Sequence, residues 1–148
     1  MGTVNDILAR KGTAVHSVCA TADVLAAARL MNEHKIGSLT VILDGKMVGI
    51  LTERDILTRV VAEHRDPIET KVGEVMTRDV LTCRPTTRLN EARKVMRERR
   101  IRHLPVLDGK EVKGMLSIGD LNHAEHDILV ETIQSMEVYI AGGSAVAS

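Results

Sequence analysis

The sequence is almost without aromatic residues: tryptophan and phenylalanine are absent, and Tyr139 is its single tyrosine. A core built from it must therefore be aliphatic, and the aromatic platforms on which single-stranded nucleic acids stack are missing. Lysine and arginine together number 20, as do aspartate and glutamate, so the formal net charge is zero. This balance removes any global electrostatic argument for binding nucleic acid or an anionic membrane. An anion site, if one exists, must be local.

Long apolar runs and cysteine clusters are also missing from the sequence. No stretch approaches the roughly 20 apolar residues that a membrane-spanning helix needs. Asp6 interrupts the segment in which a signal peptide would be apolar, so we expect a cytoplasmic protein. Cys19 and Cys83 are too few and too far apart for a disulfide framework or a Cys-x-x-Cys metal site. The 148 residues suffice for one domain of ordinary size or two very small ones.

An internal repeat organises the chain. The segment that begins at Thr21 aligns with the segment that begins at Thr86. The alignment pairs identical residues of the two copies, namely Thr21, Ala27, Met31, Glu33, Ile36 and Leu39 with Thr86, Ala92, Met96, Glu98, Ile101 and Leu104. Further along, an Asp-Gly-Lys tripeptide recurs at 44–46 and 108–110, and Asp55 corresponds to Asp120. Two copies of one unit therefore fill most of the protein.

Both copies predict the same order of elements. Apolar residues at three- and four-residue spacing predict that each copy opens with an amphipathic helix. Thr21 or Asp23 is placed to cap the first of these helices, and Thr86 or Thr87 the second. Aliphatic runs on both sides of each Asp-Gly pair then predict a hairpin. The expected strands in and before these hairpins include 15–18, 39–43, 47–51 and 80–83.

A further helix is expected after each hairpin, beginning near Thr52 and near Ser117. The second of these helices is predicted to reach about residue 140, before Gly142 and Gly143 stop it. The repeated unit is therefore β-α-β-β-α, which gives an α/β (α+β) fold class. Because one unit of this size leaves its sheet half exposed, we expect the two repeats to pack sheet against sheet as a pseudo-twofold pair.

The boundaries of the repeats follow from local composition. A small helix over 4–11, ended by Gly12, is expected before the first copy. The polar stretch over 64–71 contains Asp66-Pro67, a turn-forming pair, and is interpreted as a linker. The predicted division of the chain is repeat 1 at 8–64, repeat 2 at 72–125, a C-terminal helix at 126–140 and a disordered tail at 141–148.

Thr52-x-x-Asp55 and Ser117-x-x-Asp120 are the most informative motifs, because each stands where a strand passes into a helix. One interpretation is a helix cap, in which the hydroxyl and the acid satisfy free backbone N–H groups. The other is a ligand site. A helix N-terminus presents N–H groups to an anion, and a carboxylate beside it can accept both hydroxyls of a ribose.

These motifs carry a resemblance to a known family. The sequence has Ile36-Gly-Ser-Leu-Thr-Val and Ile101-Arg-His-Leu-Pro-Val before the hairpins, and Thr52-Glu-Arg-Asp55 and Ser117-Ile-Gly-Asp120 after them. This doubled pattern resembles a tandem pair of cystathionine β-synthase (CBS) domains, a Bateman module, of the kind found in stand-alone bacterial proteins. The resemblance implies two units packed by their sheets, with two clefts that can hold adenosine-containing ligands. It also implies a regulatory role without catalysis.

Residue by residue, the resemblance implies two sets of ligand contacts. Asp55 and Asp120 correspond to the family's ribose-binding acids, and Thr52 and Ser117 to the hydroxyls near the phosphate. Residues before the hairpins correspond to further phosphate contacts, namely Arg102 and His103 in the second copy and Lys35, Gly37 and Ser38 in the first. Arg54, inside the first motif, is either a surface residue or a phosphate partner.

The two copies differ where the family pattern often has proline. The second keeps Pro85 and Pro105, whereas the first has Ala20 and Thr40 at these positions. The two clefts therefore need not bind equally. Since no aromatic residue lies near either motif, adenine would have to sit in an aliphatic slot and be read through backbone amides.

Two other groups of residues suggest different chemistry. His123 and His126 have a three-residue spacing on a predicted helix, and such a pair can bind a metal. A third strong ligand is not evident, and a solvated helix face is the alternative. Cys19 and Cys83 stand at nearly equivalent positions at the ends of the first strands, so the pseudo-twofold relation can bring them close together.

The leading functional hypothesis is a non-enzymatic sensor that binds an adenosine-containing ligand such as AMP, ADP, ATP, NAD or S-adenosylmethionine. It would act through an effector protein or through its own oligomer, and its excess of apolar helix positions favours a homodimer. One alternative is a structural or interaction module with empty clefts, and another is a redox- or metal-linked stress protein. An enzyme is not expected, because neither a nucleophile with a base nor a pair of carboxylates emerges. No obligatory cofactor, catalytic residue, nucleic-acid partner or membrane partner is predicted.

Overall fold

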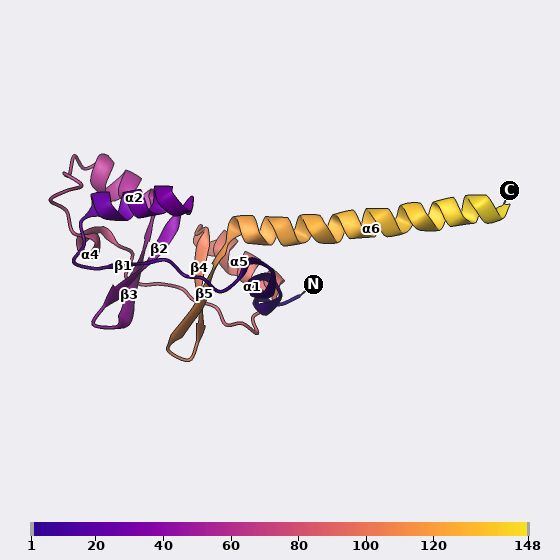
Figure 1. Ribbon diagram of the computed structural model, residues 1–148, viewed down its shortest axis with the longest axis horizontal. Helices are drawn as coiled ribbons and strands as arrows, with labels where there is room; N and C mark the ends of the chain where they lie inside the picture. Colours follow the sequence, from indigo (N-terminus) through magenta and orange to yellow (C-terminus); the bar gives the residue numbers. More distant parts are fainter. Residues whose placement is uncertain (1, 148) are drawn as a thin grey trace.

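The computed structural model describes the backbone of residues 2–147 and the side chains of residues 2–137. Two small α+β units lie side by side with their hairpins pointing in the same direction, and a long C-terminal helix projects from the second unit (Figure 1). The predicted fold class of two related repeats is confirmed, with differences at single elements.

The first repeat contains a three-stranded sheet in the order β1-β2-β3. Its elements are β1 (Ser17–Cys19), α2 (Val24–His34), β2 (Ser38–Leu43), β3 (Lys46–Thr52), the short α3 (Glu53–Ile56) and a π-helical turn, η1 (Leu57–Val61). Strand β1 runs parallel to β2, and β2 and β3 form the predicted antiparallel hairpin. Asp23 caps α2, because its carboxylate accepts a hydrogen bond from the Ala26 N–H at 2.8 Å. This resolves the choice between Thr21 and Asp23.

The second repeat contains α5 (Leu89–Arg99), β4 (His103–Asp108), β5 (Glu111–Ser117) and α6 (Ile118–Ala147). The strand predicted at 80–83 is wrong: in this described part of the chain only an isolated parallel bridge joins Cys83 to Val106. The reason lies in Pro105. In the first repeat the Thr40 N–H donates to the His16 carbonyl oxygen, at 3.2 Å, and Thr40 corresponds to Pro105, which has no N–H to donate.

The predicted cap of α5 is also wrong. Arg88 holds the N-cap position without a side-chain hydrogen bond, and the Thr87 hydroxyl instead accepts from the Arg84 N–H at 2.9 Å. The first N–H of the helix, that of Leu89, donates to the carbonyl oxygen of Gly2 at 3.0 Å. A backbone carbonyl near the start of the chain therefore accepts the hydrogen bond that a capping side chain accepts in other helices.

Two short helices are exchanged between the repeats. Helix α1 (Val4–Lys11), ended by Gly12 as predicted, precedes the first repeat along the chain but lies beside α5 and the β4–β5 hairpin of the second (Figure 1). Helix α4 (Val72–Val75), which the sequence analysis did not predict, precedes the second repeat but lies beside the sheet of the first. The predicted start of repeat 1 at residue 8 therefore cuts a helix that belongs spatially to repeat 2.

Matched hydrogen bonds hold these exchanged helices. Val4 N–H donates to the Thr87 carbonyl oxygen at 2.8 Å, and Val72 N–H donates to the Ala22 carbonyl oxygen at 2.8 Å. The next residue of each helix repeats the match, since Asn5 N–H reaches Pro85 O and Gly73 N–H reaches Ala20 O, both at 2.9 Å. Ala22 and Thr87 correspond to each other in the repeat, as do Ala20 and Pro85. The pairing confirms the pseudo-twofold relation.

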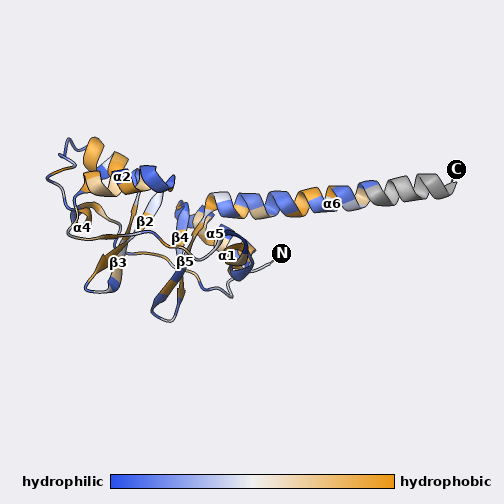
Figure 2. Cartoon of the chain, in the orientation of Figure 1, coloured by the Kyte–Doolittle hydropathy of each residue, from blue (hydrophilic) through white to orange (hydrophobic). Residues whose placement is uncertain are grey.

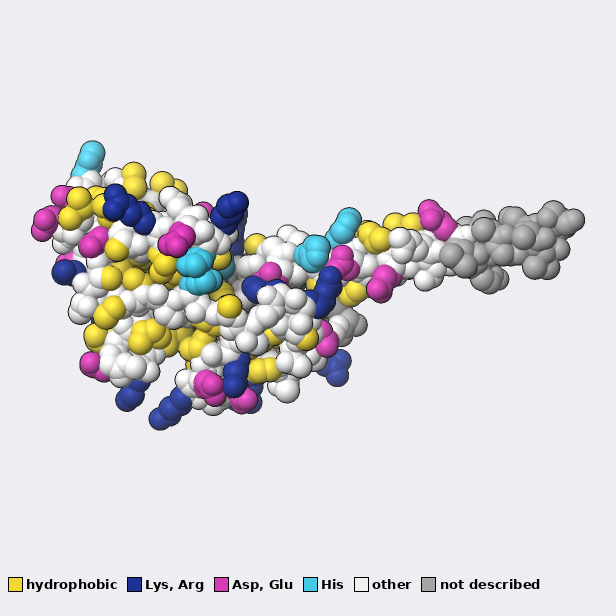
Figure 3. Space-filling model, viewed as in Figure 1, with side chains coloured by type: hydrophobic (Ala, Val, Ile, Leu, Met, Phe, Trp, Pro, Cys, Tyr) yellow, Lys and Arg dark blue, Asp and Glu magenta, His cyan; other side chains and the backbone are white. Residues whose placement is uncertain are grey.

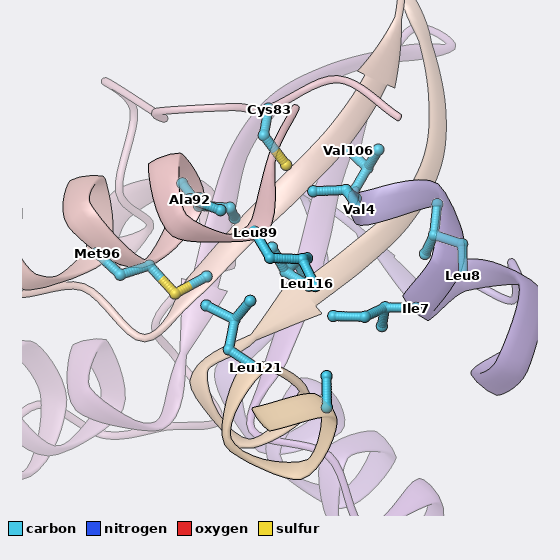
Figure 4. Close-up of a cluster of buried hydrophobic side chains, with 12 residues drawn as sticks. Val4, Ile7, Leu8, Cys83, Leu89, Ala92, Met96, Val106, Leu116 and Leu121 are labelled. Atoms are coloured by element: carbon cyan, nitrogen blue, oxygen red, sulfur yellow. The ribbon is translucent and has the colours of Figure 1, made fainter. Parts of the chain in front are cut away.

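The exchanged helices complete two separate aliphatic cores. Val4, Ile7 and Leu8 of α1 pack into the second core, where Figure 4 shows them around Leu116. The other buried residues of that core are Cys83, Leu89, Ala92, Met96, Leu104, Val106, Leu121 and Ala124. The first core is made of Ala20, Val24, Ala27, Met31, Leu39, Val41, Leu51, Val60, Val72, Val75 and Met76. Figure 2 shows hydrophobic stretches in α2 and in the strands of both hairpins, and alternating hydrophobic and hydrophilic residues along the described part of α6.

Helix α6 continues beyond the predicted stop at Gly142 and Gly143, to Ala147. Glycine is compatible with helical backbone angles and only lowers helix stability, by about 1 kcal/mol relative to alanine. The prediction of a disordered tail over 141–148 concerns residues whose side chains lie outside the described part. Within the described residues, no helix is both long and apolar enough to cross a membrane.

The exchanged helices, together with Met76 and Thr77 that follow α4, are called the exchanged segments below. They lie close to the two sheets, and this closeness predicts the effect of two glycine substitutions. A Cβ on Gly49 would lie 2.6 Å from the Thr77 carbonyl oxygen and 2.8 Å from Met76 Sδ, whereas one on Gly114 would meet Leu8 Cδ2 at 2.6 Å. We expect Gly49→Ala to lower the free energy of unfolding by about 1–3 kcal/mol. Gly114→Ala should cost less, because the end of a leucine side chain can move and a backbone carbonyl cannot.

Gly119→Ala is the matched control, since its Cβ would meet only Ser117 Oγ at 3.6 Å, an ordinary contact. Urea denaturation measures all three variants. A Gly49→Ala protein as stable as the Gly119→Ala protein would contradict the tight packing of the exchanged segment.

Candidate functional site

Both predicted motifs form reciprocal capping boxes at helix starts. Thr52 N–H donates to Asp55 Oδ2 at 2.9 Å, and Asp55 N–H donates back to Thr52 Oγ1 at 3.2 Å. In the second repeat Ser117 N–H donates to Asp120 Oδ2 at 2.8 Å, and Asp120 N–H donates to Ser117 Oγ at 3.1 Å. The capping interpretation of the motifs is therefore confirmed. The two repeats differ in the further contacts that Asp55 and Asp120 make.

Asp55 is enclosed by the protein. The residue is only 6% exposed, and its second oxygen, Oδ1, accepts a hydrogen bond from the Thr77 hydroxyl at 3.0 Å. The guanidinium of Arg59 lies 4.0 Å from the same oxygen and also donates to the carbonyl oxygens of Val75 and Met76. Both oxygens of Asp55 are thus used inside the fold, Oδ2 in the capping box and Oδ1 in the contact with Thr77, which follows α4.

Asp120 is more open. Its side chain is 21% exposed, and Oδ2 accepts from Lys11 Nζ at 2.8 Å as well as from the Ser117 N–H. Its Oδ1 has no hydrogen-bond partner among the residues that the structure describes. The ammonium of Lys11 also donates to the Met115 carbonyl oxygen at 2.8 Å. A carboxylate with a free oxygen, a lysine and the first turn of α6 therefore meet at one place.

His103 of β4 lies next to the first repeat. A Cβ on Gly37 would lie 3.5 Å from His103 Cε1 and 2.5 Å from Glu53 Oε1. Burial lowers the pKa of His103; the charges of Glu53 and Asp120 oppose this shift, and those of Lys11 and Arg102 add to it. His103 thus lies next to Gly37 on one side and responds to the charge of Asp120 on the other.

The remaining predicted site residues make other contacts. Lys35 is exposed and ends α2 in the left-handed conformation, with φ of 54°. Ser38 is buried in β2 opposite Thr52. The exposed Arg54 crosses to the second repeat, where its guanidinium donates to the Arg100 carbonyl oxygen at 3.5 Å. The Arg102 carbonyl oxygen accepts from the Ile118 N–H at 2.8 Å.

The sequence analysis missed Lys11 and Thr77, the residues that bind the two motif acids. Both come from the exchanged segments, and both are distant in sequence from the acid they contact. The sequence predicts a helix over 4–11, ended by Gly12. Signals for where a helix begins and ends do not say which repeat that helix will cover.

A cavity of about 430 Å³ lies away from these motifs. It lies beside α4 on the first repeat, and its mostly apolar lining includes Lys71 and Arg78. Its other lining residues are Ala20, Thr21, Leu43, Val48, Gly73, Glu74 and Met76. None of the predicted ligand contacts lines it.

The residues of the redox and metal alternatives lie in different environments. Cys19 is exposed, and a hydrogen bond with the Thr21 hydroxyl lowers its pKa, whereas burial raises the pKa of Cys83 to about 11. His123 Nε2 lies 3.5 Å from Asp127 Oδ2. Among the described residues no three metal-ligating side chains cluster.

His103 predicts a pH dependence of stability. Burial holds its pKa below the usual value of about 6.5, so the folded protein binds a proton on this ring less readily than the unfolded chain does. The stabilisation by the neutral ring is therefore fully present at pH values above about 6.5, the pKa of the unfolded chain. It is lost as the pH falls from there toward the lower pKa of the folded protein. We expect the melting temperature to drop less between about pH 7.5 and about pH 5.5 in His103→Gln than in the parent.

The exposed His126 provides the control, and His126→Gln should follow the parent. Thermal melts monitored by circular dichroism measure the difference. An identical drop in the parent and in His103→Gln would contradict the burial of a neutral ring at this position.

Comparison with known proteins places this geometry in a family. The family model described as "CBS domain" matches residues 4–62 and 72–127. CBS domain-containing protein CBSX3, mitochondrial, of Arabidopsis thaliana is 36% identical over 150 residues, covering 95% of this chain and 73% of the plant protein. CBS domain-containing protein YhcV of Bacillus subtilis is 35% identical over 121 residues, covering 82% of this chain and 84% of its own.

A solved structure gives the same result at the level of the fold. A CBS-domain protein from Burkholderia ambifaria is 40% identical, has a TM-score of 0.81, and is matched over 82% of this chain and 92% of its own. The doubled motifs, the matched repeats and these relatives agree. The chain belongs to the CBS-domain family, of which it carries a tandem pair.

Proposed function

We propose that this chain is a non-enzymatic regulatory module that binds an adenosine-containing ligand at Asp120. One observation carries the proposal: of the two motif acids, Asp120 alone combines an oxygen without a partner in the described structure with a neighbouring ammonium group. A carboxylate of this kind can accept ribose hydroxyls, and a cation beside a helix start suits phosphate. AMP, ADP, ATP, NAD and S-adenosylmethionine share the adenosine part.

The proposed site joins the two repeats. Ser117 and Asp120 come from the β5–α6 junction, His103 from β4, and Gly37 from the first repeat. A ligand that contacts both repeats binds best to one relative arrangement of them and shifts the population toward that arrangement. The signal would then pass to an effector protein or through the chain's own oligomer.

Two relatives support a regulatory and non-enzymatic role. The Burkholderia protein is described provisionally as a signal-transduction protein. Inosine-5'-monophosphate dehydrogenase of Korarchaeum cryptofilum matches 67% of this chain, but the match covers only 20% of that enzyme. The region that this chain shares with the enzyme is therefore only a small part of the enzyme.

The alternative function, a structural module with empty clefts, is favoured by the geometry of the first repeat and not by that of the second. Asp55 is enclosed, and its two oxygens already stabilise the start of α3 and the segment after α4. We therefore propose one strong ligand site per chain, at Asp120, with the equivalent motif of the first repeat acting as a structural cap.

This proposal predicts different effects for the two acids. Asp120→Asn should weaken AMP binding about 10- to 100-fold, by removing charge-assisted hydrogen bonds worth about 1.5–3 kcal/mol, and should change the melting temperature little. Asp55→Asn should lower the melting temperature because the partly buried Thr77 hydroxyl loses a charged acceptor. Calorimetry and thermal melts on both variants check this, beginning with a panel of the five ligands on the parent.

No melting shift and no heat with any ligand at millimolar concentration would contradict the proposal. Equal loss of stability in both variants, with unchanged binding, would show that both acids are only caps.

A homodimer is part of the proposal. Helix α6 carries an exposed apolar strip outside the second repeat (Figure 3), and η1 exposes Leu57 and Val61. The strip consists of Ile128, Leu129, Ile133 and Met136. A relative from bloom-forming cyanobacteria, a CBS-CP12 protein that is 28% identical with a TM-score of 0.74, is described as hexameric. Such relatives support self-association, for which a closed pair is the simplest form.

The dimer predicts a mass near twice 16.2 kDa by light scattering at micromolar concentration. Leu57→Glu combined with Val61→Glu should lower that mass by placing charge on the exposed apolar face of η1. A mass near 16.2 kDa for the unmodified chain would contradict the dimer.

A further inference from the structure

We infer that Lys11 makes the Asp120 site select phosphorylated ligands over the uncharged nucleoside. This inference rests on the proposed function and adds a specificity-determining residue to that site. Lys11 lies outside the motifs that the repeat identifies, at the last position of α1.

The position of the Lys11 ammonium is fixed by two acceptors and by the helix that carries it. Nζ lies 2.8 Å from Asp120 Oδ2 and 2.8 Å from the Met115 carbonyl oxygen. Helix α1 is itself anchored, because Val4 and Leu8 are buried in the second core. The ammonium is therefore held beside the acid by the fold, with its side chain still 36% exposed to a ligand.

A ribose competes with this ammonium. Asp120 Oδ2 already accepts hydrogen bonds from the Ser117 N–H and from Lys11 Nζ. Two ribose hydroxyls need both carboxylate oxygens, so the sugar takes the place of Lys11 at Oδ2. The ammonium then loses a charge-assisted hydrogen bond, and its remaining acceptor is an uncharged carbonyl oxygen.

The chemistry of the ligand decides whether that loss is compensated. Adenosine carries no charge and offers the displaced ammonium nothing in return. AMP brings a phosphate to the same neighbourhood, so the ammonium exchanges a carboxylate partner for a phosphate partner. Lys11 therefore opposes adenosine binding and assists AMP binding.

The first repeat provides an internal comparison. The group that reaches Asp55 from the exchanged segment is the neutral Thr77 hydroxyl, at 3.0 Å. The two exchanged segments thus contact equivalent acids, one with a hydroxyl and the other with a cation. Arg59, the cation near Asp55, comes from the first repeat itself and lies 4.0 Å from Oδ1. Among the described residues, an exchanged segment therefore brings a cation to Asp120 and not to Asp55.

Calorimetry with AMP and with adenosine tests the inference, using the ratio of the two dissociation constants. In the parent AMP should bind about tenfold or more tightly than adenosine, as expected for one charge-assisted contact. In Lys11→Ala the ratio should fall at least fivefold, because adenosine binds more tightly and AMP more weakly. Lys11→Arg should keep the preference.

Arg10→Ala is the matched control. Arg10 is the neighbouring cation on the same helix end, but it pairs with Asp127 and not with Asp120. Its removal should leave the ratio unchanged. Lys11→Gln, which keeps an uncharged donor on a long side chain, is the second variant should Lys11→Ala not fold, and its ratio should fall as well.

The outcomes separate the inference from the proposal on which it rests. An unchanged ratio in Lys11→Ala or Lys11→Gln, or a parallel loss of affinity for both ligands, would overturn the role of Lys11 while the parent still binds AMP. If the parent binds neither AMP nor adenosine, the proposed function fails first.

Discussion

Helix α1 precedes the first repeat along the chain yet fills the core of the second, and α4 does the reverse. Without α1 the second core would lose Val4, Ile7 and Leu8, and without Gly2, which precedes α1, the first N–H of α5 would lose its backbone acceptor. A small repeat buries little apolar surface, so such a loss is severe. The exchange therefore makes each repeat depend on a segment from outside it.

The same exchange makes two equivalent motifs unequal. Both motifs form the same capping box, and both acids receive a donor from an exchanged segment. A threonine hydroxyl binds the second oxygen of the buried Asp55, whereas a partly exposed lysine leaves one oxygen of Asp120 without a partner among the described residues. A difference of function between the repeats thus arises outside the motifs, through the residues that the exchanged segments bring to them.

Much of this architecture is readable from local signals in the sequence. The repeat, the Asp-Gly hairpins, the bounds of α1 and the capping boxes follow from residue spacing and turn chemistry. The exchange of the helices does not follow from these signals, because the apolar residues of α1 form a pattern that is compatible with packing against either core. The strand predicted over 80–83 is wrong for a different reason. The residues of this segment favour a strand, but the position it would pair with is Pro105, which has no N–H to donate. Lys11 escaped notice because its acid lies more than a hundred positions away.

Amide hydrogen exchange on a Leu8→Ala variant tests the exchanged architecture most directly. Leu8 precedes the first repeat in sequence but is buried in the second core, against Gly114. The account predicts that this substitution lowers the protection of β4 and β5, including the amide of Leu116, by about 2–5 kcal/mol of opening free energy. Protection lost only in β2 and β3, or unchanged protection at Leu116, would contradict it.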